Sequence, residues 1–596
     1  MSQAGANSGY GLFLSGSSSS SNKTALSSSP PAEGTQPASP SLSWWGSLAR
    51  NASKLVFREG RSKAGGASSD EGAVLVRIPL RAALTAENIM ASEVQMRSLY
   101  SWMLDAHMCN ERTLIMVALV FERLRGPESR MAPYIDLLPT SFNTPLHFTK
   151  AELEELRGTN LANASSTVYR NLQEQWDRLG PAMITAAKHA GLEKAPTFDD
   201  LLWAFSVYWS RGLSLPIPEE GAASMVLALQ PEKLSVQEGL MPGLDLCNHD
   251  PAAPCWWEVI APPRNASQLS PAAIDAAMGI ASEAALAGKD GMAAASDAIH
   301  LMEAGSPRES QVLLRLHQGA SLSASKELTI SYGSKSNEEL LLLYGFATQD
   351  NPHDALMMVC PLPPKNQWDN VMFARVELLQ AYGLTPQFFL QHPDAVRAAA
   401  QKSGSSPASA STSQGGALVL PPGVLDTLEV FVLNYKELSQ RMRLLRQQEN
   451  RPDVSTGEDP GTVLPVSVST LPQHSPVLDI DLLETQAVSM NGRQLGQLLD
   501  DLGMRLATLT TLERLLAVKS AEIEDTETGT GSLERDEGLL SLGQASVPPR
   551  VWACLVYRVG QKRLIRTYIT LVREELQKLM ILLRKVELMY KAAEKQ

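Results

Sequence analysis

The chain has 596 residues, more than one hydrophobic core usually supports, so we expect two or three domains. Hydrophobic residues make up 44% of the sequence and charged residues 19%, proportions typical of a soluble globular protein. The net charge of −12 argues against a general nucleic-acid-binding protein, and no apolar run reaches the roughly 18 residues that a membrane span needs.

Residues 1–50 differ in composition from the rest of the chain. They hold fifteen serines, one acidic residue (Glu33) and two basic residues (Lys23 and Arg50). A serine-rich segment that is poor in acidic residues is typical of an organellar transit peptide, but a disordered tail without a targeting role has the same composition. We therefore expect a disordered N-terminus, with the chloroplast and the cytoplasm or nucleus both open as compartments.

The five cysteines are widely spaced, and no two form a C-x-x-C pair. Neither a zinc cluster nor a disulfide framework is therefore expected, and reduced thiols favour an intracellular protein. The cysteines are Cys109, Cys247, Cys255, Cys360 and Cys554.

In the first half of the chain, Ala73–Pro79 alternates in polarity and contains β-branched residues, which predicts a strand that ends at the proline. Residues 94–126 and 150–212 are predicted to be helical, and Gly126-Pro127 stops the first of these blocks. Between the two blocks, Ala132–Pro139 is predicted to be a rigid extended link. Apolar residues recur at helical spacing in the first block, at Leu114, Val117, Ala118, Phe121 and Leu124.

The alanine-rich residues 262–310 indicate an insertion that is partly helical and lies on the surface. Residues 325–332 are predicted to form a strand and residues 336–346 a helix. Two low-complexity stretches, 400–418 and 446–475, indicate flexible loops.

Apart from those loops, the chain from residue 355 onward is predicted to be helical. Near its end, apolar residues recur every three to five positions from Leu564 to Met589, which indicates one buried helix face. A coiled-coil dimer needs a longer uninterrupted heptad run, so core packing in a monomer is the favoured interpretation.

Two short segments carry the chemistry. In Gly243–Asp250, the polar pair Asn248 and His249 follows an apolar run, and in Ile330–Asn337, Tyr332 ends an apolar strand before a glycine-containing turn. An Asn-His pair is often only a capped turn, and a tyrosine at a strand end often only packs in the core. The order of these two segments and their spacing of about 80 residues favour the interpretation that both contribute to one site.

These two segments resemble the core of SET-domain methyltransferases, and more closely the family typified by the Rubisco large-subunit lysine methyltransferase. The resemblance covers most of residues 55–355 and returns at 530–590. Further segments similar to the family's motifs are Gly126–Pro139, Ser206–Arg211, Tyr332–Phe346, Asp350–Asp354, Ser532–Glu537 and Pro549–Arg558, with Gln561-Lys562 after the last.

The resemblance implies an α+β fold and three regions of the chain. After the N-terminal residues 1–50, a SET-domain β-fold occupies 51–355, with an inserted helical subdomain at about 95–210 and the alanine-rich insertion. An all-α domain then occupies 356–596. The implied function is that of an S-adenosylmethionine-dependent protein-lysine N-methyltransferase whose protein substrate binds the C-terminal helices. Because the family includes an actin-histidine methyltransferase, histidine stays open as the target.

The chemistry of methyl transfer explains why the family needs these residue types. A lysine of pKa about 10.4 is only about 0.1% neutral near pH 7.4, equivalent to about 4 kcal/mol, and an apolar channel helps by disfavouring the ammonium. A tyrosine hydroxyl can then orient the amine, and the resemblance gives this catalytic part to Tyr332. It gives cofactor-binding parts to Asn248, His249, Arg211, Tyr344 and Phe346.

One segment departs from the family. Its cofactor-binding G-R-G-L turn aligns with Gly60-Arg-Ser-Lys63, so that Gly60 is kept but Ser62 stands where glycine is expected. Glycine at such turns supplies positive φ or room for a ligand. The alternative hypothesis is therefore a catalytically weak SET-fold protein that acts as a protein-binding module.

Overall fold

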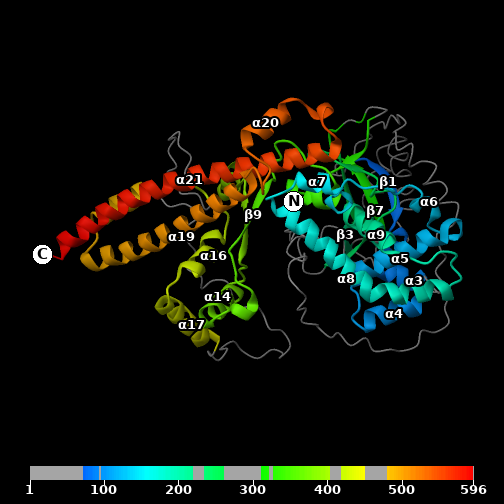
Figure 1. Cartoon of the computed structure of the whole chain (residues 1–596), viewed down its shortest axis with the longest axis horizontal. Coiled ribbons are helices and arrows are strands. Elements are labelled where there is room, and N and C mark those ends of the chain that lie inside the picture. The colour runs from blue at the N-terminus through cyan, green and yellow to red at the C-terminus, as the bar shows by residue number, and fades with distance from the viewer. Residues whose placement is uncertain are drawn as a thin grey trace, which may run out of the picture. The chain divides into compact units, whose positions relative to one another are not determined.

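The structure is a computed structural model, and it describes residues 72–92, 96–218, 234–260, 310–320, 322, 326–402, 418–449 and 480–594. The serine-rich N-terminus, the Gly60–Lys63 segment, the alanine-rich insertion and most of the two low-complexity stretches lie outside these residues. The described chain forms two compact units (Figure 1). The first contains the residues up to Phe142 and Thr167–Gly333, and the second contains Asn143–Ser166 and the chain from Ser334.

The first unit is built on two small sheets. The larger one has the strand order β1-β7-β6-β8-β5, in which β1, β7 and β6 run antiparallel while β8 pairs in parallel with both β6 and β5. Its strands are β1 (Val74–Pro79), β7 (Gln311–Leu316), β6 (Cys255–Ile260), β8 (Thr329–Ile330) and β5 (Asn248–His249). The smaller sheet is antiparallel, in the order β2 (Leu84–Thr85), β4 (Leu234–Leu240) and β3 (Leu213–Pro218).

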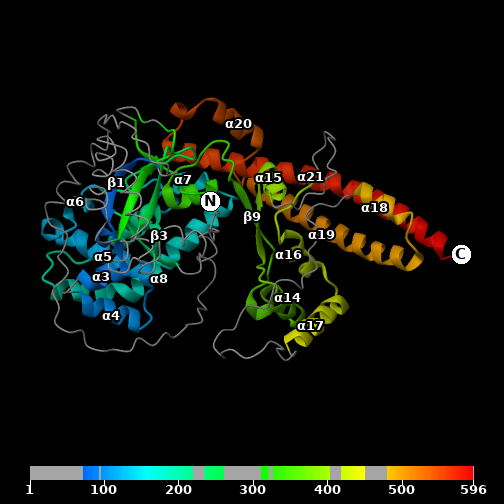
Figure 2. The same ribbon diagram turned by 180° about the vertical axis from the view of Figure 1, so that it is seen from behind.

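Helices pack around these sheets, as the view from behind shows (Figure 2). The central helix α5 (Glu111–Arg125) is buried from Thr113 to Phe121. The side chain of Asn110 caps its N-terminus, and Gly126, with a φ of 57° that suits glycine, ends it. Helix α5 packs against α9. The N-terminus of α9 is capped by a reciprocal pair of hydrogen bonds between Thr197 and Asp200. The helices of this unit are α3 (Ala86–Ser92), α4 (Arg97–Asp105), α5, α6 (Ala132–Ile135) and α9 (Phe198–Arg211); α8 (Asn160–His189) begins in the second unit.

Two local predictions for this unit need correction. Ala132–Pro139 is not an extended link, because Ala132–Ile135 forms the short helix α6. Pro133 stands in its first turn, where a missing N–H costs nothing, and Tyr134 is anchored in the core at 1% exposure. The strand predicted at 325–332 is shortened to Thr329–Ile330.

The second unit is mainly helical, which confirms the prediction for the C-terminal region. The long helices α19 (Gly492–Glu524) and α21 (Pro549–Ala593) pack along each other, and the apolar face predicted from Leu564 onward is buried between them. Other helices are α7 (Lys150–Glu154), α14 (Asn370–Ala381), α15 (Pro393–Lys402), α16 (Val424–Val432), α17 (Tyr435–Glu449), α18 (Ile480–Ala487) and α20 (Leu533–Ser541).

This unit also contains an antiparallel pair of strands, β9 (Ala355–Val359) and β10 (Gln387–Gln391), which the sequence did not predict. The β9 sequence Ala-Leu-Met-Met-Val consists mostly of good helix formers, so local propensity favoured a helix. Pairing with β10 and burial of Leu356 and Met358 in the core of the unit override that preference.

A buried ion network joins α20 to α21. Asp536 accepts hydrogen bonds from Arg558, at 2.8 Å to each carboxylate oxygen, and from Lys562 at 2.5 Å. The Lys562 ammonium also donates to the carbonyl of Gly531 at 2.7 Å. These residues come from the C-terminal segments that carry the family resemblance, and their part in the described structure is to hold two helices together.

A second buried acid that contacts α21 is Glu338, in the short helix α13 (Asn337–Glu339). Its carboxylate accepts a hydrogen bond from the Tyr557 hydroxyl at 2.5 Å. Burial raises the pKa of Glu338 to about 7; the nearby carboxylates of Asp354 and Glu339 add to the rise, and Tyr557 and Lys519 oppose it. As pH rises, the folded protein therefore keeps the proton on the Glu338 carboxyl up to a higher pH than the unfolded protein does.

We expect Glu338→Gln to flatten the pH dependence of stability near neutrality. Because the folded pKa of Glu338 is raised, its stabilising contribution is present at low pH and is lost as pH rises through about 7. The wild-type free energy of unfolding should fall by roughly 1–3 kcal/mol between pH 5 and pH 8, and the variant should lose less. Urea unfolding followed by circular dichroism at several pH values checks this, and parallel curves for the two proteins would contradict it.

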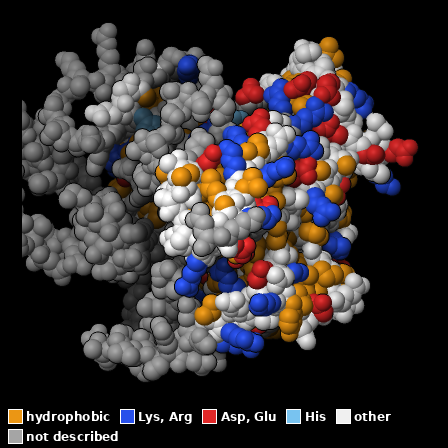
Figure 3. Space-filling model, turned by 90° about the vertical axis from the view of Figure 1, so that its left-hand side faces the viewer, with side chains coloured by type: hydrophobic (Ala, Val, Ile, Leu, Met, Phe, Trp, Pro, Cys, Tyr) orange, Lys and Arg blue, Asp and Glu red, His pale blue; other side chains and the backbone are white. Residues whose placement is uncertain are grey.

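The surface of the molecule is mixed in character. Figure 3 shows acidic, basic and apolar side chains interspersed over one of its faces. On α21, ion pairs with other helices of the second unit include Arg566 with Glu524 and Arg573 with Glu513. Within the described part of the chain, no helix is long and apolar enough to cross a membrane, and no group of three or more potential metal ligands occurs.

Candidate functional site

The pairing of β5 with β8 brings the two chemical motifs together. Asn248 lies opposite Thr329 and His249 opposite Ile330, and Tyr332 follows two residues after β8 ends. The polar pair and the tyrosine are about 80 residues apart in sequence, yet they lie at the same end of two neighbouring strands. This is the juxtaposition that the sequence motifs predict.

His249 and Tyr332 are in direct contact. The backbone N–H of Tyr332 donates to Nδ1 of His249 at 3.0 Å, and the two rings lie 5.0 Å apart between centroids with an angle of 30°. Nδ1 of the imidazole is thus the acceptor of this bond. His249 thus fixes the backbone at the point where Tyr332 leaves the strand.

The Tyr332 hydroxyl is held by the motif on the neighbouring strand. It donates to the backbone carbonyl of Cys247 at 2.8 Å. Burial raises the pKa of Tyr332 to about 12, and Arg211 acts in the opposite direction. The group therefore stays a neutral phenol at physiological pH, so it can position another group by hydrogen bonding but cannot act as a tyrosinate base.

Asn248 is the exposed member of the site. Its side-chain amide donates to the carboxylate of Glu327, which comes just before β8. Because the side chain lies at the surface, the amide can exchange this partner for a ligand with little disturbance of the core.

Arg211 reaches the same loop from the C-terminal end of α9. Its Nη1 donates to the backbone carbonyl of Asp245 at 2.7 Å, and its Nε is buried without a hydrogen-bond partner among the described residues. A buried guanidinium N–H without a partner is costly, and a carboxylate is the acceptor whose geometry suits it. Arg211 thus contacts the segment that carries Asn248 and His249, and its Nε donor has no partner among the described residues.

Asp245 and Tyr134 belong to the site although the sequence analysis did not select them. Asp245 is 5% exposed and accepts from the Tyr134 hydroxyl at 2.5 Å and from the Gly243 N–H at 3.1 Å. Burial raises the pKa of Asp245 to about 6, with Arg211 opposing the rise. A signal was available, since an aspartate inside the apolar run Gly-Leu-Asp-Leu-Cys is buried only when it has partners.

Four further predicted site residues lie in the second unit or outside the described residues. Tyr344 and Phe346 belong to the second unit, where their rings pack edge to face at 6.4 Å between centroids. Gly60 and Ser62 lie outside the described residues. The cofactor-binding parts given to these four residues stay predictions.

Comparison with solved structures identifies the fold. The SET domain of LSMT bound to lysine and AdoHcy matches 90% of this chain and 92% of its own, with a TM-score of 0.52 and 15% sequence identity. The same domain bound to methyl-lysine and AdoHcy matches 91% and 94%, with a TM-score of 0.53 and 16% identity. Rubisco LSMT bound to AdoMet matches with a TM-score of 0.50. The chain has the SET-domain fold of Rubisco LSMT. The α+β fold class and the resemblance predicted from sequence are thereby confirmed at the level of the fold.

Sequence relatives match over shorter stretches. The ribosomal lysine N-methyltransferase set10 of Schizosaccharomyces pombe is 24% identical over 256 residues, 43% of this chain and 35% of its own. The actin-histidine N-methyltransferase of Gallus gallus is 31% identical over 129 residues, 21% of this chain and 19% of its own, and that of Homo sapiens is 30% identical over 138 residues. This chain therefore spans about a third or less of these relatives. No protein-family model matches the sequence.

Proposed function

We propose that the protein is an S-adenosylmethionine-dependent protein-lysine N-methyltransferase. Three observations support this function: the SET-domain fold, the similarity to a ribosomal lysine methyltransferase, and the neighbouring solved structures, which hold AdoHcy or AdoMet and lysine. The observation that carries it is the fixed position of the Tyr332 hydroxyl on the Cys247 carbonyl, beside His249 and Arg211.

The residues of the site fit S-adenosylmethionine. This cofactor carries a carboxylate, and Arg211 has a buried Nε donor that no described group satisfies. The exposed Asn248 amide offers both a donor and an acceptor for the other polar groups. When bound, the cofactor supplies a methyl group activated by a sulfonium.

The chain itself has to orient the acceptor amine and to favour its neutral form. Tyr332 is kept as a phenol whose O–H donates to the Cys247 carbonyl, so its oxygen can accept an N–H from the amine and align the amine lone pair. The burial that raises the pKa of the tyrosine also disfavours an ammonium ion in the same place. Alignment and desolvation are the contributions that an in-line methyl transfer needs from a protein.

For the partner, we propose a protein substrate that binds through the helices of the second unit, with the enzyme acting as a monomer inside the cell. The net charge of −12 supports a basic protein rather than a nucleic acid as the partner. The chloroplast and the cytoplasm or nucleus are the candidate compartments.

Histidine is the second candidate for the methylated residue. The actin-histidine methyltransferases match this chain at a higher identity than the lysine methyltransferase does, though over half the length. A third candidate is a catalytically weak protein-binding module, which the serine at position 62 favours. Titration of S-adenosylmethionine into the purified protein, followed by calorimetry, tests this alternative, because a protein that gives no saturable heat cannot be the proposed enzyme.

Ser62 provides a graded test of cofactor binding. If Gly60–Lys63 forms the cofactor turn, Ser62→Gly should strengthen binding by about fivefold, because glycine avoids the cost of positive φ. Ser62→Val should weaken it, because a β-branched residue tolerates positive φ poorly and crowds a ligand. Cofactor titration into the three proteins measures the effect, and three equal affinities would place the segment away from the pocket.

A further inference from the structure

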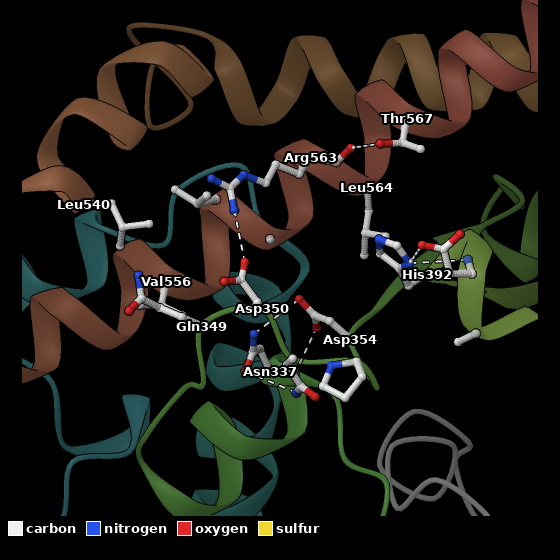
Figure 4. Close-up of a pocket in the computed structure, with 16 residues that line it drawn as sticks. Asn337, Gln349, Asp350, Asp354, His392, Leu540, Val556, Arg563, Leu564 and Thr567 are labelled. Carbon is white, nitrogen blue, oxygen red and sulfur yellow. Dashed lines mark hydrogen bonds and ion pairs between the residues drawn. The ribbon is translucent and has the colours of Figure 1, made fainter. Parts of the chain in front are cut away.

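A cavity lies wholly within the second unit, and none of the candidate-site residues lines it. Its volume is about 750 Å³, within the range of sites that hold small molecules or short peptides. Figure 4 shows the side chains of α21 along one side of this groove and Asp350, Asp354 and Asn337 along the other, with His392 at one end and Leu540 at the other. None of these residues has a part in the proposed methyl transfer.

The groove has an apolar wall and an acidic rim. The wall consists of Leu540 of α20 and Val556, Val559 and Leu564 of α21. Among the charged residues that line the groove are three aspartates, Asp350, Asp354 and Asp394, against one arginine, Arg563. The side chains of Asp350 and Asp394 are 87% and 73% exposed, so their charges face solvent at the rim.

The single cation of the lining does not cancel this acidity. The Arg563 guanidinium donates from Nε to a carboxylate oxygen of Glu537 at 2.8 Å and from Nη1 to one of Asp350 at 3.4 Å. Asp394 is paired with Arg397 at 2.7 Å, and His392 lies 3.6 Å from it. Counting Glu537 and Arg397 with the exposed rim, the three carboxylates of Asp350, Asp394 and Glu537 face two guanidinium groups, which leaves the rim negative.

Asp354 gives the groove its fixed floor. Its carboxylate accepts from the Asn337 backbone N–H at 3.0 Å and from the Asn337 side chain at 3.3 Å. A side chain at Gly560 of α21 would meet Asp354 Oδ2 at 2.5 Å, so glycine at this position lets the helix and the carboxylate approach each other. The shape of the groove is thus set by rigid, buried elements, and only its rim is exposed.

We propose that this groove binds a peptide segment that bears lysine or arginine side chains. Such side chains combine an apolar stem, which suits the wall of valines and leucines, with a cationic head, which suits the acidic rim. The inference rests on the proposed function in one respect, that a basic protein binds the second unit. The binding itself needs no S-adenosylmethionine, so a failure of peptide binding can be told apart from a failure of methyl transfer.

The test is the affinity of the full-length protein for a fluorescent peptide of alternating leucine and lysine, measured by anisotropy. Asp350→Asn combined with Asp394→Asn removes two rim charges, and asparagine tolerates the φ of 49° at position 350 well. We expect the affinity of this variant to fall by about fivefold or more. Thr567→Lys, which places a cation on the exposed side of the groove, should weaken binding as well.

The matched control is Asp500→Asn combined with Glu574→Gln, which removes two exposed charges of α19 and α21 outside the groove. It should bind the peptide as the wild type does, and Tyr332→Phe should also leave binding unchanged. A peptide of alternating leucine and glutamate should not bind. Equal affinity of the wild type and the rim variant, or an equal loss in the control variant, would overturn the proposal.

Discussion

Tyr332→Phe should lower the rate of methyl transfer by roughly tenfold to a thousandfold. The change removes one hydroxyl, keeps the ring that packs on His249, and deletes one oriented hydrogen bond worth about 1.5–4 kcal/mol in the transition state. Affinity for S-adenosylmethionine should barely change, because the hydroxyl binds the Cys247 carbonyl and not a group assigned to the cofactor. Single-turnover rates with saturating cofactor, together with cofactor titration, measure the two effects separately.

The control for this experiment is Tyr435→Phe, which removes a hydroxyl from a tyrosine that is 73% exposed on α17 of the second unit. It should leave turnover at the wild-type value. If Tyr332→Phe also turns over at the wild-type rate, Tyr332 only packs against His249 and the assigned mechanism is wrong.

Asn248→Ala combined with His249→Ala should abolish detectable binding of S-adenosylmethionine while the fold persists. Asn248 is exposed and His249 half-buried, so both can be shortened without opening a large cavity in the core. The loss should be greater than for either single change, because His249 also fixes the backbone of Tyr332. Calorimetric titration measures affinity, and circular dichroism with thermal melting shows whether the double variant is folded.

A matched pair of changes at exposed positions in the second unit, Asn370→Ala with His353→Ala, should leave cofactor affinity unchanged. Undiminished affinity in a folded Asn248→Ala, His249→Ala variant would instead show that the strand pair β5–β8 lies away from the cofactor.

Much of the fold could be predicted because local patterns and tertiary structure agree. The buried helix α5 shows helical spacing of apolar residues, a capping asparagine and a terminal glycine, and the structure has each of them. The apolar face of α21 is equally plain in sequence. The site residues Asn248, His249, Arg211 and Tyr332 came from a family resemblance, and the structure brings these four together.

What could not be predicted depends on partners that are distant in sequence. The strand β9 is recognisable only with β10 beside it, because its residues favour a helix. Helix α6 forms where two prolines suggested an extended link. In this helix the buried Tyr134 donates a hydrogen bond to Asp245, a partner that the local sequence does not contain. The apolar run around Asp245 indicates that this carboxylate is buried, but its partner Tyr134 is more than 100 residues away, so the sequence does not show what it binds.

The most direct test of the proposed activity is the chemical identity of the methylated residue. Purified protein is incubated with S-adenosylmethionine labelled in its methyl group and with extract of cells that lack the protein, and the labelled proteins are hydrolysed to amino acids. The account predicts label in N-ε-methylated lysine with the wild type and little with Tyr332→Phe. Label in N-methylhistidine would contradict lysine as the target, and no label with a wild-type protein that binds the cofactor would contradict the proposed activity itself.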